Sequence, residues 1–208
     1  MYRMRHIVLF LFSFCLLSAA AAQEGNSVVQ GFSGGMMVHA GYLSGTNGNA
    51  PVGFQGVSSG MGGALRVNVG RFFRVGMEGY VSTLGSGCSD AKEFLSAGSY
   101  IRTGQGGLLV ELCRREGRWW PFVGVSLGGG AMKGLYIVEG DQSDWEAEGC
   151  VVYNRQPFVY VAPSVGTDYC VTPKIHLTIR ADWSMALHDG TLIRPTGARM
   201  FVGVMFCH

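Results

Sequence analysis

The chain has 208 residues, of which 48% are hydrophobic and only 14% are charged, and 33 are glycine. Soluble domains usually have about a quarter of their residues charged, and glycine disfavours helices, so this composition argues against an ordinary soluble helical domain. The formal net charge of +2 gives no general reason to expect a nucleic-acid partner.

The first segment, residues 1–22, has the pattern of a secretory signal peptide. Arg3 and Arg5 give it a basic start, an apolar run follows from residue 7 to residue 17, and the alanines end at Ala22 in an A-x-A pattern. The run is shorter than the ~20 residues that a spanning helix needs. We therefore expect residues 1–22 to be removed, and residues 23–208 to form one exported domain whose 14 basic and 14 acidic residues balance.

The rest of the chain alternates apolar and polar residues with a period of two, which predicts β-strands. About eight such stretches occur, each near the ~10 residues that cross a bilayer obliquely. They are residues 34–42, 60–70, 74–82, 104–113, 121–132, 158–171, 174–188 and 198–208. Tight turns alternate with longer polar loops at about 44–52, 84–98, 138–156 and 188–197, as in barrels with short periplasmic turns and longer outer loops.

The stretch from Lys174 to His188 indicates which face of each strand meets lipid. Leu177, Ile179 and Trp183 share one parity, whereas Arg180 and Asp182 share the other. An arginine facing lipid at the bilayer midplane costs ~2–4 kcal/mol, so the apolar parity should face lipid. The prediction is an all-β fold, an eight-stranded antiparallel up-and-down transmembrane β-barrel. A soluble lipocalin-like binding barrel with its valines inside is the alternative, but the polar parity has few Lys and Glu for a solvent-facing surface.

The polar parity predicts a network of charges inside the barrel. Eight strands leave an interior just wide enough for side chains to fill, and an unpaired buried charge costs ~3–5 kcal/mol, so we expect these charges to pair. The expected luminal residues are Arg66, Glu78, Glu111, Asp168, Arg180 and Asp182, with His39 and His176 nearby. A polar lumen filled by side chains is the main prediction, and a narrow gated pore is the alternative.

The chain resembles the eight-stranded outer-membrane barrels of the OmpA/OmpX type. The likeness is carried by the leader, by "PFVGVSLGGG" after a short turn, and by the final strand "RMFVGVMF". It implies an outer membrane of a Gram-negative-type bacterium, the barrel-insertion machinery as a partner, and contact with outer-membrane lipids and lipopolysaccharide. It also implies that carboxylate–arginine pairs could gate the lumen. In the family an aromatic residue usually ends the chain, whereas here Phe206 is followed by Cys207 and His208.

Aromatic residues and cysteines have positions of interest in the predicted barrel. An aromatic girdle is expected near the tight-turn ends, formed by Trp119, Trp120, Tyr169 and Phe206. Cys88 and Cys150 fall in neighbouring outer loops and could form a disulfide in an oxidising compartment, which is kept as a hypothesis. Cys113, Cys170 and Cys207 lie on alternate strands, where two strand spacings of ~4.8 Å exceed the ~7 Å limit between bridged α-carbons, so we expect free thiols.

The third long loop holds five carboxylates without a basic residue. They are Glu139, Asp141, Asp144, Glu146 and Glu148. The spacing does not match an EF-hand, so the loop is either a solvated acidic segment or a candidate cation-binding loop that bridges to lipopolysaccharide phosphates. No metal site or cofactor is predicted elsewhere.

A hydrolase would need a serine activated by a histidine that a carboxylate orients. Ser184, His188 and Asp182 share one parity, but that parity faces the lumen and not the acyl chains of lipid, so we expect no enzyme. A lipid-modifying enzyme is kept as an alternative. The function expected is structural or surface-interactive, such as membrane integrity or adhesion, with a host or surface ligand bound through the outer loops.

Overall fold

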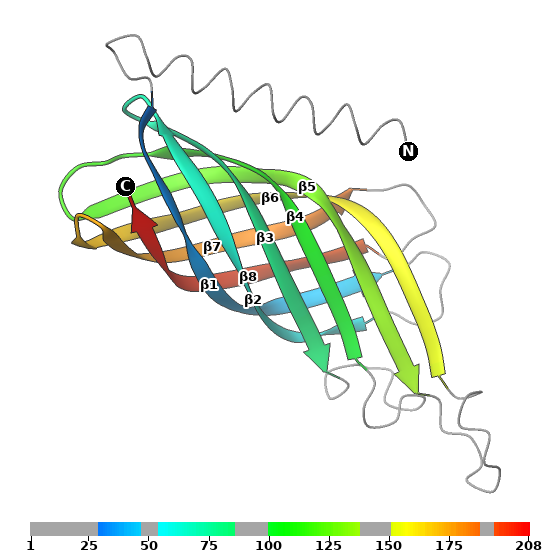
Figure 1. The fold of residues 1–208 in the computed structure, drawn as a ribbon. Helices are drawn as coiled ribbons and strands as arrows, with labels where there is room; N and C mark the ends of the chain where they lie inside the picture. Colours follow the sequence, from blue (N-terminus) through cyan, green and yellow to red (C-terminus); the bar gives the residue numbers. More distant parts are fainter. Residues whose placement is uncertain (1–28, 47–53, 86–99, 138–150, 188–193) are drawn as a thin grey trace, which may run out of the picture.

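The computed structural model describes residues 29–46, 54–85, 100–137, 151–187 and 194–208. In these ranges the chain forms eight strands: β1 (Val29–Thr46), β2 (Phe54–Val69), β3 (Phe73–Gly85), β4 (Tyr100–Cys113), β5 (Trp119–Ile137), β6 (Val151–Thr172), β7 (Ile175–Leu187) and β8 (Arg194–Cys207). Each strand pairs antiparallel with the next, and β1 pairs with β8 to close a barrel (Figure 1). The predicted fold class is confirmed. The predicted signal peptide lies outside the described residues.

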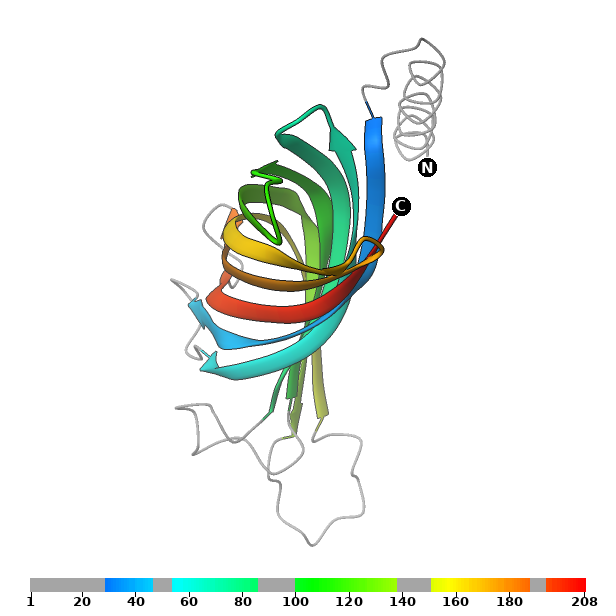
Figure 2. The ribbon, with the colours of Figure 1, turned by 90° about the vertical axis from the view of Figure 1, so that its left-hand side faces the viewer.

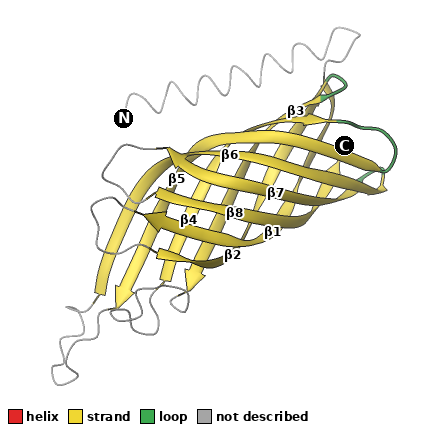
Figure 3. Cartoon of the chain, turned by 180° about the vertical axis from the view of Figure 1, so that it is seen from behind, coloured by secondary structure: helices red, strands yellow, loops and turns green. Residues whose placement is uncertain are grey.

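The three short turns lie together at one end of the barrel, where Figure 3 draws them in green. Gly70 and Gly117 provide the left-handed backbone that the first two turns require, with φ of 59° and 69°. In the third turn the Thr172 hydroxyl accepts a hydrogen bond from the backbone N–H of Ile175 at 3.0 Å. The strand ends that flank the four longer connections lie at the opposite end (Figure 1).

The barrel is closed where the two ends of the described chain meet. Phe32 and His208 exchange two backbone hydrogen bonds of 3.0 and 2.9 Å, and their rings stack with centroids 5.1 Å apart. Pairing then continues between β1 and β8 from Ser33 opposite Cys207 to Thr46 opposite Arg194. Among the described residues, no helix is long and apolar enough to cross a membrane.

The two parities of each strand have opposite environments. The outward parity carries large apolar side chains with high exposure, such as Met36 at 70% and Leu65 at 59%. The inward parity is buried, with Arg66 at 1% and Arg180 at 0%. Figure 2 shows how the strands curve around the interior. The valines face outward, which is the reverse of the arrangement expected for the lipocalin-like alternative.

The strands extend further toward the loop end than the alternation predicted. Residues 151–156 and 194–197 were expected in loops, but they belong to β6 and β8, where Val151 pairs with Ile137 and Arg194 with Thr46. Both segments contain polar residues, which hide a strand in a hydropathy pattern. Alternation with apolar outward residues is needed only along the ~25 Å apolar band of a membrane barrel, so strands can continue beyond it.

Candidate functional site

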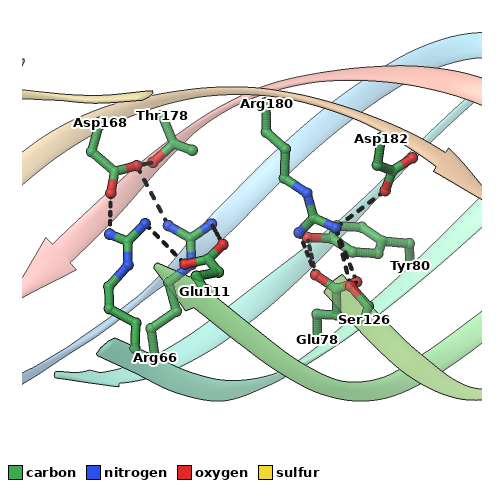
Figure 4. Close-up of polar contacts among 10 residues, drawn as sticks. Arg66, Glu78, Tyr80, Glu111, Ser126, Asp168, Thr178, Arg180 and Asp182 are labelled. Carbon is green, nitrogen blue, oxygen red and sulfur yellow. Dashed lines mark hydrogen bonds and ion pairs between the residues drawn. The ribbon is translucent and has the colours of Figure 1, made fainter. Parts of the chain in front are cut away.

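The candidate site is the lumen, in which charged side chains form two groups that are seen side by side in Figure 4. The first group is nearer the loop end and is called here the central cluster: Glu78, Ser126, Arg180, Asp182 and Arg199. These residues come from β3, β5, β7 and β8. Arg180 and Asp182 meet because residues two apart on a strand point to the same side.

The central cluster is held by aligned hydrogen bonds. Arg180 binds the Glu78 carboxylate through Nη1 and also through Nη2 at 3.2 Å. The Ser126 hydroxyl donates to the same carboxylate at 2.6 Å. Arg199 donates two hydrogen bonds to the Asp182 carboxylate, from Nε at 2.8 Å and from Nη2 at 2.7 Å. Such bidentate arginine–carboxylate pairs are among the strongest polar contacts in proteins.

The second group, called here the inner cluster, lies nearer the short turns: Arg66, Arg74, Glu111, Asp168 and Thr178. Glu111 lies 3.3 Å from Arg66 Nη2 and 2.9 Å from Arg74 Nη2. Asp168 contacts both arginines and accepts a hydrogen bond from Thr178 at 2.7 Å. Both guanidinium groups also lie over the Phe122 ring, with Cζ 5.1 and 4.7 Å from its centroid.

The contacts in the inner cluster are less well aligned. Both oxygens of Glu111 are buried without a hydrogen-bond partner, as are Nε and Nη2 of Arg66 and of Arg74. In the central cluster, Arg180 Nε is the only buried side-chain atom without a hydrogen-bond partner. Glu111 is therefore held by charge at short range rather than by directed hydrogen bonds.

The sequence prediction missed two members of this network, Arg74 and Arg199. Both are buried, at 3% and 4% exposure, and each has the parity of the luminal residues on its strand. With them the described lumen contains four arginines against the four carboxylates of Glu78, Glu111, Asp168 and Asp182. The signal was available, because two arginines alone would have left two buried carboxylates without cations.

The two predicted luminal histidines are buried but belong to neither charge cluster. His39 Nε2 lies 2.7 Å from the Ser82 hydroxyl, and its ring packs against Phe201 with centroids 4.9 Å apart. His176 packs edge-on against Trp120 at 4.6 Å. The His39 ring thus lies between Tyr80 and Phe201, whereas His176 packs against one aromatic ring and also lines the cavity at the turn end.

The contact with His176 corrects the predicted aromatic girdle. Trp120 has the luminal parity of its strand, because it directly precedes outward Pro121 and lies two residues before buried Phe122. Trp119 and Tyr169 pack together on the outside with centroids 4.7 Å apart, and Phe206 is 57% exposed. The girdle prediction was wrong for Trp120, because the strand begins at Trp119 and adjacent residues face opposite sides.

The lumen is polar where the charge clusters lie, as predicted, but toward the loop end it contains an apolar layer that the sequence did not predict. The residues there form what we call the apolar collar: Leu43, Leu84, Ile101, Met132, Phe158, Tyr160, Ala162 and Ala186. Apart from the Tyr160 hydroxyl, which is buried without a hydrogen-bond partner, these side chains fill the narrow barrel with apolar atoms. The interior therefore has charged layers toward the turns and an apolar layer toward the loops.

A cavity of about 510 Å³ opens at the turn end beside the inner cluster. Its charged lining includes Arg74, Arg115 and Lys174, and no carboxylate side chain lines it. Cys207 also lines this cavity, and it is a free thiol, as are Cys113 and Cys170. Within the described ranges, no group of His, Cys, Asp and Glu side chains could hold a metal ion.

The exposed turn between β4 and β5 contains the one described carboxylate outside the lumen. Glu116 accepts hydrogen bonds from Arg114 at 3.0 and 2.6 Å and lies 3.5 Å from Arg71. The hydrogen bonds and charge of Arg114 hold the pKa of Glu116 below its usual value.

Several predicted residues lie outside the described ranges. They are Cys88 and Cys150, the acidic residues Glu139, Asp141, Asp144, Glu146 and Glu148, and His188. Of the triad considered for hydrolysis, Ser184 and Asp182 are both buried, and both Asp182 oxygens are bound by Arg199.

The closed barrel and its filled lumen can be compared with known proteins. The chain matches no protein-family model, and no curated sequence matches it significantly. Among solved structures, Neisserial surface protein A superposes with a TM-score of 0.53 at 11% identity, over 84% of this chain and 96% of that one. The fold is that of a small outer-membrane β-barrel.

A second small outer-membrane barrel gives a similar result. Ail, the attachment invasion locus protein of Yersinia pestis, superposes with a TM-score of 0.51 at 10% identity, over 86% of this chain and 99% of Ail. That structure was solved in complex with the heparin analogue sucrose octasulfate. At these identities the likeness concerns the fold alone.

Proposed function

We propose that the chain is a non-enzymatic protein of the bacterial outer membrane with a closed lumen, and that it acts through its surfaces rather than through a pore. The observation that carries this proposal is the filled interior. Large side chains such as Arg66, Arg180, Tyr160 and Phe201 are at most 1% exposed. Arg66, Arg180 and Tyr160 come from the inner cluster, the central cluster and the apolar collar, and Phe201 packs against Arg180 and Arg199, so these side chains fill successive layers between the two ends.

The outward face supports the outer-membrane location. Its side chains are apolar over most of each strand, and those such as Val125, Val165 and Val202 are between 42% and 57% exposed. Exposed apolar area on this scale is stable only when another apolar medium covers it. A lipid bilayer surrounds a membrane barrel on all sides and can cover this whole outward face.

A role in surface contact is the finer part of the proposal. The barrel has four long connections at one end, and the similar barrel Ail was solved with a sulfated heparin analogue. We assign contact with a host or surface ligand to these connections. An array of sulfated and unsulfated glycans, probed with the folded chain in micelles, tests this part, and equal signals on both sets would contradict a charge-dependent ligand.

The closed lumen is tested by conductance. The chain from residue 23 onward is refolded in detergent, its folded form is verified by faster migration on unboiled gels, and it is inserted in planar bilayers. No steps of current above background are expected. Regular steps from the folded chain would overturn the closed lumen.

A gated pore is the second candidate, favoured by one feature of the central cluster. Arg180 lies between two carboxylates, bound to Glu78 and with Nη2 3.2 Å from Asp182. A shift of its head group from one to the other would rearrange the plug. If the wild type conducts, Glu78→Ala should change the size or frequency of its current steps, and unchanged steps would remove this candidate.

The absence of enzymatic activity is tested on lipids. Asp182 is bound to two arginines, which leaves it unsuited to orient a catalytic histidine. Lipid A extracted from cells with and without the expressed chain should have the same mass spectrum. The loss or gain of one acyl chain would show a lipid-modifying enzyme.

A further inference from the structure

Three basic side chains lie side by side on the outer face of the barrel, toward the loop end. Arg102 on β4 pairs directly with Lys133 on β5, and Lys133 pairs directly with Arg155 on β6. All three are exposed, whereas their strand neighbours Ile101 and Met132 are buried in the apolar collar. The barrel wall is therefore complete at this level, and the three basic groups are outside it.

The three strands change from apolar to basic at the same paired row. On β5 the outward side chains from Val123 to Ala131 are apolar or glycine, and Lys133 follows. On β6 the outward residues from Val165 to Pro157 are apolar, and Arg155 follows. The row of Arg102, Lys133 and Arg155 thus ends the continuous apolar stretch that begins near the turn end of these strands, and it is called here the basic row.

The height of the basic row can be estimated from strand geometry. Lys133 is fourteen residues from Trp119 on the same strand, and Trp119 is at the turn end. With ~3.4 Å per residue and a strand tilt of ~45°, this separation is about 34 Å along the membrane normal. The apolar band of such barrels is ~25 Å tall, so Lys133 lies in the headgroup layer on the loop side.

The row lacks a counter-charge among the described residues. Directly paired outward residues have Cβ atoms ~4.5–5.5 Å apart, and like charges at this separation repel. Of the described carboxylates, Glu78, Glu111, Asp168 and Asp182 are inside the barrel, and Glu116 is in a turn at the other end. An anion bound across the row would relieve this repulsion.

Small residues lie directly beneath the row on the lipid-facing side. The next outward row pairs Gly104 with Ala131, and the one below it pairs Gly106 with Gly129. A Cβ atom added to Gly104 would have no heavy atom within 4 Å, so the surface is open there. An acyl chain can therefore lie against the wall immediately below a headgroup held by the three basic residues.

We propose that Arg102, Lys133 and Arg155 form a binding site for the phosphate group of an anionic lipid in the loop-side leaflet. Arginine donates paired hydrogen bonds that match phosphate geometry, and lysine adds a compact positive charge. Tyr100, which is 41% exposed and belongs to the next outward row, has a hydroxyl that can serve as a further donor. The site rests on the proposed membrane location and names a partner for it.

The test compares two lipids that differ only in the phosphate. Phosphatidic acid and diacylglycerol with the same acyl chains are titrated into micelles of the folded chain, and bound lipid is counted by native mass spectrometry. The variant Arg102→Gln/Lys133→Gln/Arg155→Gln removes the basic row. The matched control Arg71→Gln/Arg114→Gln/Arg118→Gln removes three positive charges from the turn end.

Wild type should bind phosphatidic acid more tightly than diacylglycerol. The basic-row variant should lose about 100-fold in affinity for phosphatidic acid, since each basic residue near an anionic surface contributes about a fivefold gain. The control should keep the tight site. Arg102→Lys/Arg155→Lys should lose less affinity than the basic-row variant, because it retains the charge but not the paired hydrogen bonds of arginine.

Three results would overturn the proposal. The first is equal binding of both lipids by wild type, which is expected if the carboxylates between residues 138 and 150 neutralise the row. The second is an unchanged affinity in the basic-row variant, and the third is an equal loss in both triple variants. Unboiled gels verify that each variant is folded. Because conductance is measured separately, a conducting barrel would contradict the closed lumen without affecting this result.

Discussion

The inner and central clusters have the same composition of charge, two arginines and two carboxylates, but they are stabilised differently. In the central cluster Arg180 and Arg199 meet Glu78 and Asp182 through directed hydrogen bonds. In the inner cluster Glu111 has short contacts with its arginines but no aligned hydrogen bond. Equal charge counts therefore do not imply equal contributions to stability.

The inner and central clusters also differ in their access to water. Arg74 of the inner cluster lines the cavity of about 510 Å³ at the turn end, so water can reach a charge that loses its partner there. The central cluster lies deeper, between the inner cluster and the apolar collar. A charge left alone in the central cluster would stay desolvated, which is the costlier situation.

The largest effect is expected for Glu78→Gln in the central cluster. The substitution keeps the size of the side chain but removes the carboxylate that Arg180 and Ser126 bind. Arg180 then keeps only one carboxylate contact, at 3.2 Å with Asp182, whose two oxygens Arg199 already binds. The cost should therefore approach the ~3–5 kcal/mol of a buried charge that has lost its partner. Urea unfolding of the chain in lipid vesicles, followed by tryptophan fluorescence, should show this loss. A change below about 1 kcal/mol would mean that water reaches Arg180.

Glu111→Gln, the matched change in the inner cluster, should cost less, about 1–3 kcal/mol. Asp168 still contacts both Arg66 and Arg74, and the adjoining cavity can hydrate them. The same unfolding measurement compares the two variants directly. If Glu111→Gln is as destabilising as Glu78→Gln, the difference in alignment between the clusters has no energetic meaning.

The coupling free energy between paired residues, a smaller quantity, gives a finer comparison of the two clusters. The cycle of Asp182→Ala, Arg199→Ala and the double variant should give a coupling free energy toward the upper end of the ~0.5–3 kcal/mol found for contacting residues. The cycle of Glu111→Ala and Arg74→Ala should give a smaller one, because that contact lacks aligned hydrogen bonds. Equal coupling free energies would contradict this order.

The fold could be predicted from the sequence because a lipid-facing strand must alternate. Leu177, Ile179 and Trp183 against Arg180 and Asp182 have one low-energy arrangement in a bilayer, and it determines both the strand and its orientation. The signal weakens beyond the apolar band. There Arg155 faces outward in a segment that the pattern indicates as a loop, and only its pairing with Lys133 identifies it as strand.

The candidate site was predictable in composition but not in contacts. Parity placed Glu78 and Arg180 inside, but which arginine meets which carboxylate depends on the shear of the barrel, since Arg180 and Glu78 are on strands that are not neighbours. The same holds for the basic row, because the pairing of Arg102 with Lys133 requires the register of β4 and β5. The alternation of residues predicts on which face of the sheet a side chain lies. Which residue it pairs with on the next strand depends on the register, and the register is known only from the closed sheet.

The smallest effect concerns Glu116, an exposed carboxylate that serves as a reference for the buried ones. Hydrogen bonds from Arg114, together with its charge, lower the pKa of Glu116 from its usual value of 4.5. A lowered pKa in the folded state means that the pair stabilises the fold above the unfolded-state pKa and that this contribution disappears as the pH falls through the folded-state pKa. Glu116→Gln should therefore reduce stability slightly at neutral pH and leave it unchanged in strong acid. Unfolding midpoints of both chains between neutral pH and pH ~3 measure the difference, and a gap that widens as the pH falls would contradict the assignment of Arg114 as the cause.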